Sequence, residues 1–272
     1  MDIAATRAGR DRPSRSRRAV VIDPPGVHRS HPHAFVPDAP AVAAGSAATV
    51  LSGGALTDAP SDAYRIAHPV ARALKRTLDI AGVVPLLLLL ALVTPFVALA
   101  IKATSRGPVL FRQTRIGRGG TPFPLFKFRS MYCDAEERLA ADQDLFESYI
   151  DNGFKVPQSC DPRITPVGRI LRKLSIDELP QALNVLAGHM SLVGPRPVVP
   201  SEVFSLYGDE ADAYLVCKPG LTGRWQVSGR SDVTHADRVE LDLAYAEGWT
   251  LWGDVALLIR TIPAVLSGRG AH

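Results

Sequence analysis

A run of 22 uncharged residues, from Ile80 to Ile101, constrains this chain more than any other feature of its sequence. That length is about what a helix needs to match the hydrocarbon core of a bilayer. Basic residues flank the run on both sides: Arg72, Lys75, Arg76, Lys102 and Arg106. A helix buried in a protein core is normally shorter and lacks such flanks, so we predict that this segment contacts a membrane.

The apolar segment could cross the bilayer, or it could enter and leave by the same face. Pro85 and Pro95 each remove a backbone donor and favour a bend within a helix. Lys and Arg are retained on the cytoplasmic side of membranes, and here both flanks are basic. A straight crossing would also carry an arginine-rich N-terminal arm through the membrane. We therefore predict a re-entrant membrane helix with both ends on the cytoplasmic face.

Residues 1–64 are rich in Ala, Pro, Ser and Arg and show no helical or strand periodicity. A segment this polar buries too little apolar surface to offset its ordering entropy, so we predict a disordered basic arm. Its first 18 residues contain six arginines against only Asp2 and Asp11. Such an arm either binds anionic lipid or remains a solvated tail, and the sequence leaves both interpretations open.

Charge and cysteine content narrow the class of partner and the compartment. The formal net charge of +4 favours an anionic partner, which nucleic acid, phospholipid or a phosphorylated small molecule would each satisfy. No acidic residue occurs between Asp79 and Asp134, while seven basic residues lie from Lys102 to Arg129, a stretch suited to binding phosphate. The three cysteines are odd in number and widely spaced, which fits a reducing compartment better than a disulfide framework.

After the apolar run, the sequence predicts an α+β fold that is mostly helical. Extended pieces at Pro108–Phe111 and Phe123–Phe128 flank a glycine turn and predict a small β-hairpin. A loop is expected at Asp161–Gly168. Helical patterns cover Asp134–Ile150, Ile176–Ala187, about Val233–Glu247, and Trp252–Leu266. We divide the chain into the arm at 1–64, a membrane-associated segment at 65–106 and a cytoplasmic catalytic domain at 107–272.

Asp177 and Glu178 form an acidic pair at the start of one predicted helix. Ser175 followed by Glu178 matches a capping box, which would explain the pair without catalysis. Pro180 would cost a hydrogen bond inside such a helix, so the regular helix could instead begin there. Either arrangement leaves two carboxylates at a helix N-terminus, where the helix dipole favours negative charge.

Cations lie on both sides of the acidic pair in the sequence. The basic residues before it are Arg169, Arg172 and Lys173. Behind the helix, Arg196 stands between Pro195 and Pro197, and a stiff backbone there suits presenting a guanidinium to a phosphate. A further loop, Lys218–Trp225, combines glycine turns with cations and one aromatic residue.

Together these motifs resemble the bacterial sugar transferase family, the polyprenyl-phosphate phosphoglycosyl transferases. The matching motifs follow family order: Lys75-Arg76 with Asp79, Gly107–Val109, Phe111–Gly117, Lys127–Met131, Asp161–Thr165, Leu174–Pro180, Gly188–Ser191, Val193–Pro197 and Lys218–Gly223. Larger members carry several membrane helices before this core, so the chain resembles the small, single-segment type. The family's membrane break is typically Ser-Pro, whereas this chain has Thr94-Pro95 and an additional Pro85.

The resemblance implies transfer of a sugar-1-phosphate from a UDP-sugar to undecaprenyl phosphate, or another polyprenyl phosphate, with release of UMP. It implies a covalent aspartyl-phosphosugar intermediate on Asp177 and a role in starting exopolysaccharide or glycan assembly. Mg²⁺ is the expected cofactor, held by Glu178 and Asp177. The expected substrate-binding residues are Arg112, Lys127, Arg129, Arg172, Pro195, Arg196, Pro197 and Lys218.

The same resemblance implies a bacterial inner (cytoplasmic) membrane protein with a cytoplasmic catalytic domain. Its expected partners are the UDP-sugar, the polyprenyl phosphate lipid, an anionic membrane surface and downstream glycan-assembly glycosyltransferases, and no nucleic acid. One alternative is a membrane-anchored metal-dependent glycosyltransferase or nucleotidyltransferase, for which Asp142-Gln143-Asp144 is the best motif. Another is a non-enzymatic basic membrane scaffold. No residue indicates which sugar is transferred.

Overall fold

The computed structural model describes residues 64–151, 156, 160–229 and 234–266. The predicted arm lies outside these residues except for Tyr64, so its disorder stays a prediction. The described chain is mostly helical with two small sheets, which confirms the α+β class.

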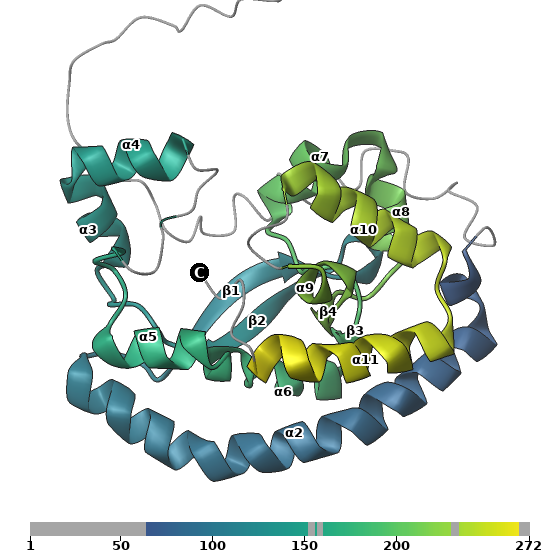
Figure 1. The fold of residues 1–272 in the computed structure, drawn as a ribbon, viewed down its shortest axis with the longest axis horizontal. Coiled ribbons are helices and arrows are strands. Elements are labelled where there is room, and N and C mark those ends of the chain that lie inside the picture. Colours follow the sequence, from purple (N-terminus) through teal and green to yellow (C-terminus); the bar gives the residue numbers. More distant parts are fainter. Residues whose placement is uncertain (1–63, 152–155, 157–159, 230–233, 267–272) are drawn as a thin grey trace, which may run out of the picture. The chain divides into compact units, whose positions relative to one another are not determined.

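The apolar run lies within one long helix, α2, Pro69–Thr104, which follows a short 3₁₀ turn, η2, Arg65–Ala67. Pro85 and Pro95 stand inside α2 without ending it. The Thr94 hydroxyl donates to the Leu90 carbonyl oxygen at 2.6 Å, a bond that often accompanies bending. In Figure 1, α2 is bowed along its length and both ends rise toward the rest of the domain. Neither proline interrupts the helix, and re-entry of α2 by the same membrane face stays a prediction.

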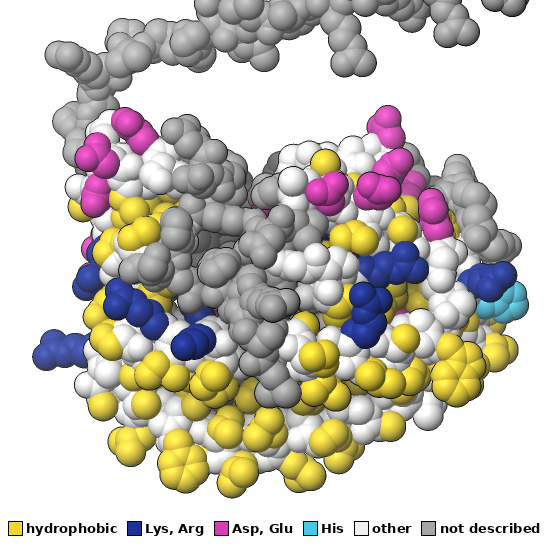
Figure 2. All heavy atoms as spheres, in the orientation of Figure 1, with side chains coloured by type: hydrophobic (Ala, Val, Ile, Leu, Met, Phe, Trp, Pro, Cys, Tyr) yellow, Lys and Arg dark blue, Asp and Glu magenta, His cyan; other side chains and the backbone are white. Residues whose placement is uncertain are grey.

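The two faces of α2 have different surroundings. Four large side chains spaced three or four residues apart are each at least 67% exposed: Leu88, Leu92, Phe96 and Leu99. The opposite face packs on the domain through Val83, Leu90, Val97 and Ile101. Figure 2 shows hydrophobic side chains gathered along the edge that α2 occupies in Figure 1. Among the described residues, α2 is the one helix long and apolar enough to span a bilayer.

The predicted hairpin is confirmed. Strand β1, Leu110–Ile116, pairs antiparallel with β2, Pro122–Phe128, and Leu110 lies opposite Phe128. The connection contains a 3₁₀ turn, η3, Arg118–Gly120, in which Gly119 has a φ of 67° that favours glycine. The hairpin is longer than predicted because Arg112–Arg115 are polar and give no apolar signal.

The following stretch forms two helices, α3, Ala135–Ala141, and α4, Gln143–Asp151. The loop expected at Asp161–Gly168 is wrong in its last three residues, because α5 runs from Pro166 to Lys173. Proline suits the first helical position, where its missing N–H would have no helical acceptor. Thr165 caps this helix by accepting the Gly168 N–H at 2.9 Å.

After α5 come a 3₁₀ turn, η4, Ile176–Glu178, and helix α6, Gln181–Ala187, which ends at Gly188 with a φ of 83°. A second sheet pairs β3, Ser191–Val193, in parallel with β4, Gly220–Thr222. The sequence did not predict it, since three-residue strands are too short to show alternation. The remaining elements are α7, Pro200–Tyr207; η5, Gly208–Glu210; α8, Ala211–Leu215; α9, Arg224–Val227; α10, His235–Glu247; and α11, Leu251–Leu266.

The largest apolar core gathers side chains from α2, β2, α6, β3, α10 and α11. Val83 of α2, Leu125 of β2 and Val193 of β3 are members of this cluster and are almost completely buried. The apolar helix therefore packs on the domain on one side while it exposes the other.

Candidate active site

The acidic pair lies in η4, between α5 and α6. Ser175 begins this turn with a left-handed φ of 55°, and its side chain caps no backbone N–H. The capping-box interpretation is therefore wrong. The α-helix begins at Gln181 with Pro180 as its N-cap, one residue later than the alternative predicted. Asp177 and Glu178 are held by the junction of two helices rather than inside one.

The two carboxylates of the pair have different environments. Asp177 is only 7% exposed, whereas the Glu178 side chain is 40% exposed. Burial raises the pKa of Asp177 to about 6; the charges of Lys127 and Arg172 lower it and that of Glu178 raises it further. Asp177 is therefore a buried carboxyl that ionises near neutral pH, beside a carboxylate that reaches solvent.

Two predicted cations lie at this pair. Lys127, on β2, donates from Nζ to Glu178 Oε1 at 2.7 Å. Arg172, on α5, donates from Nε to the Ser130 hydroxyl at 2.9 Å, which fixes its side chain. Burial lowers the pKa of Arg172, while the charge of Asp177 raises it. Sequence reasoning missed Ser130, because a single serine gives no signal of a bond to a residue 42 positions away.

The turn Pro195–Pro197 is fixed by donors to its backbone. Pro195 and Pro197 have no N–H, so these two residues form backbone hydrogen bonds only through their carbonyl oxygens. Gly220 N donates to the Pro195 carbonyl and Tyr214 Oη to the Arg196 carbonyl. Arg115 Nη1 donates to the Pro197 carbonyl, and Ile116 N to that of the next residue, Val198. These bonds range from 2.8 to 3.3 Å and come from β4, α8 and β1. The predicted stiffness of the turn therefore has a structural basis, and Pro195 and Pro197 support Arg196 rather than offering polar groups to a ligand.

The Arg196 side chain packs on an aromatic ring. Its guanidinium carbon lies 4.8 Å from the centre of the Trp225 ring. Burial lowers the pKa of Arg196, and the charge that raises it most is that of Glu178. Within the described ranges, no residue forms a hydrogen bond or ion pair with this guanidinium. A cation held in this way, and electrostatically linked to the acidic pair, is suited to bind an anion.

Three other predicted substrate-binding residues lie elsewhere. Arg112 is exposed and stacks on Phe126, on the face of the hairpin opposite to Lys127. Arg129 is buried, and its terminal nitrogens donate to the Ser105 and Arg106 carbonyls at 3.0 and 2.7 Å. Arg129 thus joins β2 to the end of α2. A basic sequence gives the same signal whether its cations bind phosphate or carbonyl oxygens.

Lys218 lies at the far end of α6 from the acidic pair. A Cβ at Gly188 would lie 3.6 Å from Lys218 Nζ and 3.8 Å from Arg76 Nη2. Burial lowers the pKa of Lys218, and nearby Arg118 and Arg76 lower it further. Arg76 itself donates to the Val185 and Leu186 carbonyls at 2.6 and 2.8 Å. Lys218 therefore belongs to a set of basic side chains beside the start of α2, which also includes Arg72, Arg76 and Arg118.

The donor atoms of the chain limit which metal could bind. No cluster of three or more His, Cys, Asp or Glu side chains forms among the residues that the structure describes. Asp177 and Glu178 alone would not complete a zinc or calcium cage. They do fit Mg²⁺, which is usually bound by one or two carboxylates together with substrate phosphates.

The motif of the alternative glycosyltransferase, Asp142-Gln143-Asp144, lies at the junction of α3 and α4. Asp142 accepts the Leu145 N–H at 3.0 Å and thereby caps α4. All three side chains are exposed, and helix capping accounts for the position of Asp142.

Comparison with known sequences identifies the family. The profile described as bacterial sugar transferase matches residues 70–268. The undecaprenyl-phosphate galactose phosphotransferase of Salmonella typhimurium is 45% identical over 212 residues, which cover 76% of this chain and 43% of that protein. The UDP-glucose:undecaprenyl-phosphate glucose-1-phosphate transferase of Caulobacter vibrioides is 42% identical over 205 residues, with 73% and 72% covered.

The exopolysaccharide production protein ExoY of Rhizobium meliloti is 41% identical over 209 residues, covering 75% of this chain and 91% of ExoY. The matched part of this chain thus spans less than half of the Salmonella relative and most of ExoY. The matched segment contains α2, the acidic pair and the Arg196 turn. The chain belongs to the bacterial sugar transferase family.

Proposed function

We propose that this chain transfers a sugar-1-phosphate from a UDP-sugar to undecaprenyl phosphate, as the first step of exopolysaccharide or glycan assembly. The observation that carries the proposal is the buried Asp177 beside Glu178, with Lys127 and Arg172 close enough to shift its pKa. The names of the Salmonella and Caulobacter relatives support undecaprenyl phosphate as acceptor, and that of the Caulobacter protein supports a UDP-sugar donor.

In the proposed reaction, an Asp177 carboxylate oxygen attacks the β-phosphorus of the donor. A bond forms between that oxygen and phosphorus, the bond from phosphorus to the bridging oxygen breaks, and UMP leaves with the electron pair. An oxygen of the lipid phosphate then attacks the same phosphorus and releases the Asp177 carboxylate. A pKa near 6 leaves this carboxylate ionised at neutral pH and more basic than an exposed aspartate.

Phosphoryl transfer depends chiefly on positioning and on neutralising charge. Arg172 and Lys127 lie at the acidic pair, and Arg196 is held rigidly by its turn. These cations would bind the diphosphate and the departing UMP. Mg²⁺ bound by Glu178 and Asp177 would neutralise further charge on the diphosphate.

The exposed apolar side chains suggest how the lipid substrate reaches the site. Besides α2, large exposed residues occur on α5, α6 and α11: Ile170, Leu183, Leu186, Trp252, Ile259 and Ile262. Leu174, three residues before Asp177, is also exposed. We place this apolar surface in the cytoplasmic leaflet of the bacterial inner membrane, with α2 re-entering the same face. The acidic pair would then face lipid phosphates at headgroup depth.

The test is incubation of the purified protein with a panel of UDP-sugars, with and without undecaprenyl phosphate. Without lipid we expect UMP up to one equivalent of enzyme, and mass spectrometry of acid-quenched protein should find a phosphosugar on the Asp177 peptide. Adding lipid should make UMP release continuous. Release of UDP would indicate the glycosyltransferase alternative, and release of no nucleotide would indicate the scaffold. UMP release that requires both substrates would exclude the covalent intermediate.

A further inference from the structure

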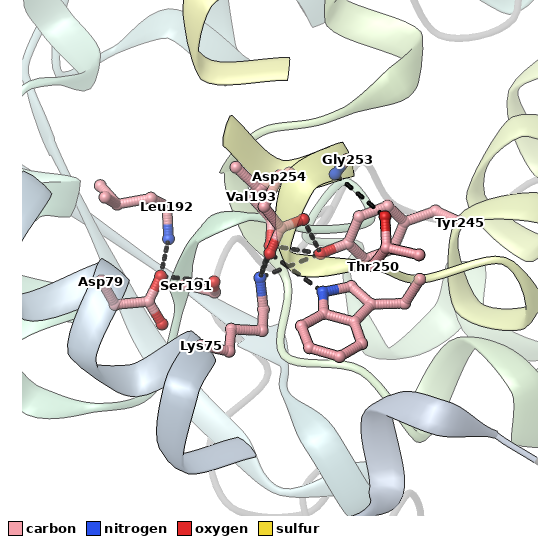
Figure 3. Close-up of polar contacts among 10 residues, drawn as sticks. Lys75, Asp79, Ser191, Leu192, Val193, Tyr245, Thr250, Gly253 and Asp254 are labelled. Atoms are coloured by element: carbon pink, nitrogen blue, oxygen red, sulfur yellow. Dashed lines mark hydrogen bonds and ion pairs between the residues drawn. The ribbon is translucent and has the colours of Figure 1, made fainter. Parts of the chain in front are cut away.

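A buried polar cluster outside the acidic pair connects the membrane helix to the strand before Arg196 (Figure 3). Lys75 of α2 donates from Nζ to the Val193 carbonyl at 2.8 Å, to the Tyr245 hydroxyl at 2.9 Å and to Asp254 Oδ2 at 2.6 Å. An ammonium group has three protons, so each has an acceptor. Both charged side chains are buried, and that of Asp254 is fully so.

Asp254, in the first turn of α11, is equally well bonded. The Trp249 indole N–H donates to its Oδ2 at 3.0 Å, and the Tyr245 hydroxyl lies 2.9 Å from its Oδ1. Tyr245 Oη also lies 3.0 Å from the Val193 carbonyl oxygen. Burial raises the pKa of Tyr245, so its phenol stays neutral. The four side chains and the Val193 carbonyl form what we call the Lys75 cluster.

One helical turn after Lys75, Asp79 binds the start of the same strand. Asp79 Oδ1 accepts from the Ser191 hydroxyl at 2.7 Å and from the Leu192 N–H at 2.8 Å. At Gly82, a Cβ would lie 2.5 Å from Leu192 Cδ1, so α2 packs closely against β3. Two residues of α2, four positions apart, therefore hold all three residues of β3.

This attachment is adjacent to the proposed phosphate-binding turn. Val193 is three residues before Arg196, and Gly194 donates its N–H to the Thr222 carbonyl at 2.9 Å. The far side of the turn is anchored to Tyr214 and Ile116. Lys75 and Asp79 thus fix the near end of a short segment that carries Arg196 and is held by several backbone hydrogen bonds.

We infer that Lys75 is a positioning residue for the proposed reaction. By bonding to β3, it sets the position of the Arg196 turn relative to α2. The inference rests on the proposed function, in which Arg196 binds the donor diphosphate. A buried ion pair by itself is weak evidence for stability, because apolar replacements are often as stable. If Lys75 positions the turn, folded variants without the Lys75 cluster lose turnover. If the cluster only stabilises the fold, folded variants keep it.

The test uses Lys75→Met/Asp254→Asn, which removes both charges together, and Tyr245→Phe, which removes one hydroxyl. The control is Leu139→Ala, because Leu139 is buried in α3 and its truncation lowers stability by leaving a cavity. Helix α3 packs on α4, and Leu139 is not a member of the apolar clusters that contain β3 or adjoin the Arg196 turn. Each protein is measured for turnover, KM for UDP-sugar, thermal unfolding and hydrogen exchange of the peptide 191–198.

We expect the double variant to lose about 100-fold in turnover and Tyr245→Phe about tenfold, since displacement of about 1 Å can cost that much. The peptide 191–198 should exchange faster in both, while Leu139→Ala keeps wild-type turnover and wild-type exchange of this peptide. Folded variants with wild-type turnover and exchange would overturn the inference. If the double variant fails to fold, Tyr245→Phe decides. If wild-type protein releases no UMP, the proposed function fails, and hydrogen exchange still tests whether the Lys75 cluster holds the turn.

Discussion

The burial of Asp177 has one consequence for the proposed reaction and another for the stability of the fold. Replacing it with Asn keeps the side-chain size but removes the attacking charge. We expect Asp177→Asn to reduce UMP release to near background while UDP-sugar binding survives, because Lys127, Arg172 and Arg196 remain. Turnover by radiometric or coupled assay and binding by calorimetry would check this. A variant that still formed the phosphosugar adduct would refute the assignment of the nucleophile.

The raised pKa of Asp177 predicts an unusual pH dependence of stability. Its folded-state pKa of about 6 exceeds the ordinary 3.8, so the folded protein favours the neutral acid. The ionisation of Asp177 therefore lowers the stability of the wild type as pH rises from about 4 to about 6, and the full cost of this one group persists above that range. Asp177→Asn should be more stable than wild type at pH 7.5, by on the order of 1–3 kcal/mol, and equal to it near pH 4. Urea unfolding at the two pH values measures the difference.

Glu178→Gln should behave differently from the change at its neighbour. Glu178 is partly exposed and bonded to Lys127, and in the proposed reaction it helps to hold Mg²⁺. The amide keeps a weaker oxygen ligand, so we expect a loss of turnover that high Mg²⁺ partly reverses. Titration of activity against Mg²⁺ would show a raised half-saturation. A loss of turnover independent of Mg²⁺ would argue against Glu178 as a ligand.

At the scale of elements, the bowed α2 predicts that both of its ends lie on one side of the membrane. Single cysteines at Ala67 and Thr104 should resist an impermeant thiol reagent in intact cells and react after permeabilisation. The background must first lose Cys133 and Cys160, which are exposed cysteines. Efficient labelling of the Ala67 site in intact cells would show a straight crossing. Pro85→Ala/Pro95→Ala tests whether the prolines enforce the return path, since it should increase labelling there.

The elements that could be predicted were those with a long periodic or apolar signal. The span of α2, the hairpin and the last two helices are of this kind, whereas β3 and β4 have three residues each. The start of α6 depended on whether Ser175 capped or Pro180 began the helix, and a left-handed φ at Ser175 decided it. Local chemistry favours several conformations at such a junction, and tertiary contacts select one.

The acidic pair and Arg196 could be predicted because they lie in compact motifs. The Lys75 cluster could not, since its bonds join residues 118 to 179 positions apart. Arg129 was assigned to substrate because a basic run does not reveal which cations bind backbone carbonyls. The sequence therefore does not predict which charged residues pair across the fold.

For the whole molecule, the N-terminal arm should be dispensable for chemistry. Residues 1–60 lie outside the family match, and the described domain has its own core. A protein lacking them should keep wild-type turnover with detergent-solubilised substrates. Its binding to anionic vesicles could fall, which would separate a lipid tether from a catalytic role. Loss of turnover in a truncated protein that remains folded would show that the arm contributes to the site.

The attachment of α2 at both ends limits how this protein could be re-engineered. Lys75 and Asp79 tie its first half to β3, and Arg129 ties its end to β2 through the Ser105 and Arg106 carbonyls. A chimera carrying an unrelated anchor of equal length and hydropathy would still reach the bilayer, but it would lack both attachments. Grafting should therefore succeed only when the donor segment comes from a relative that preserves these contact positions.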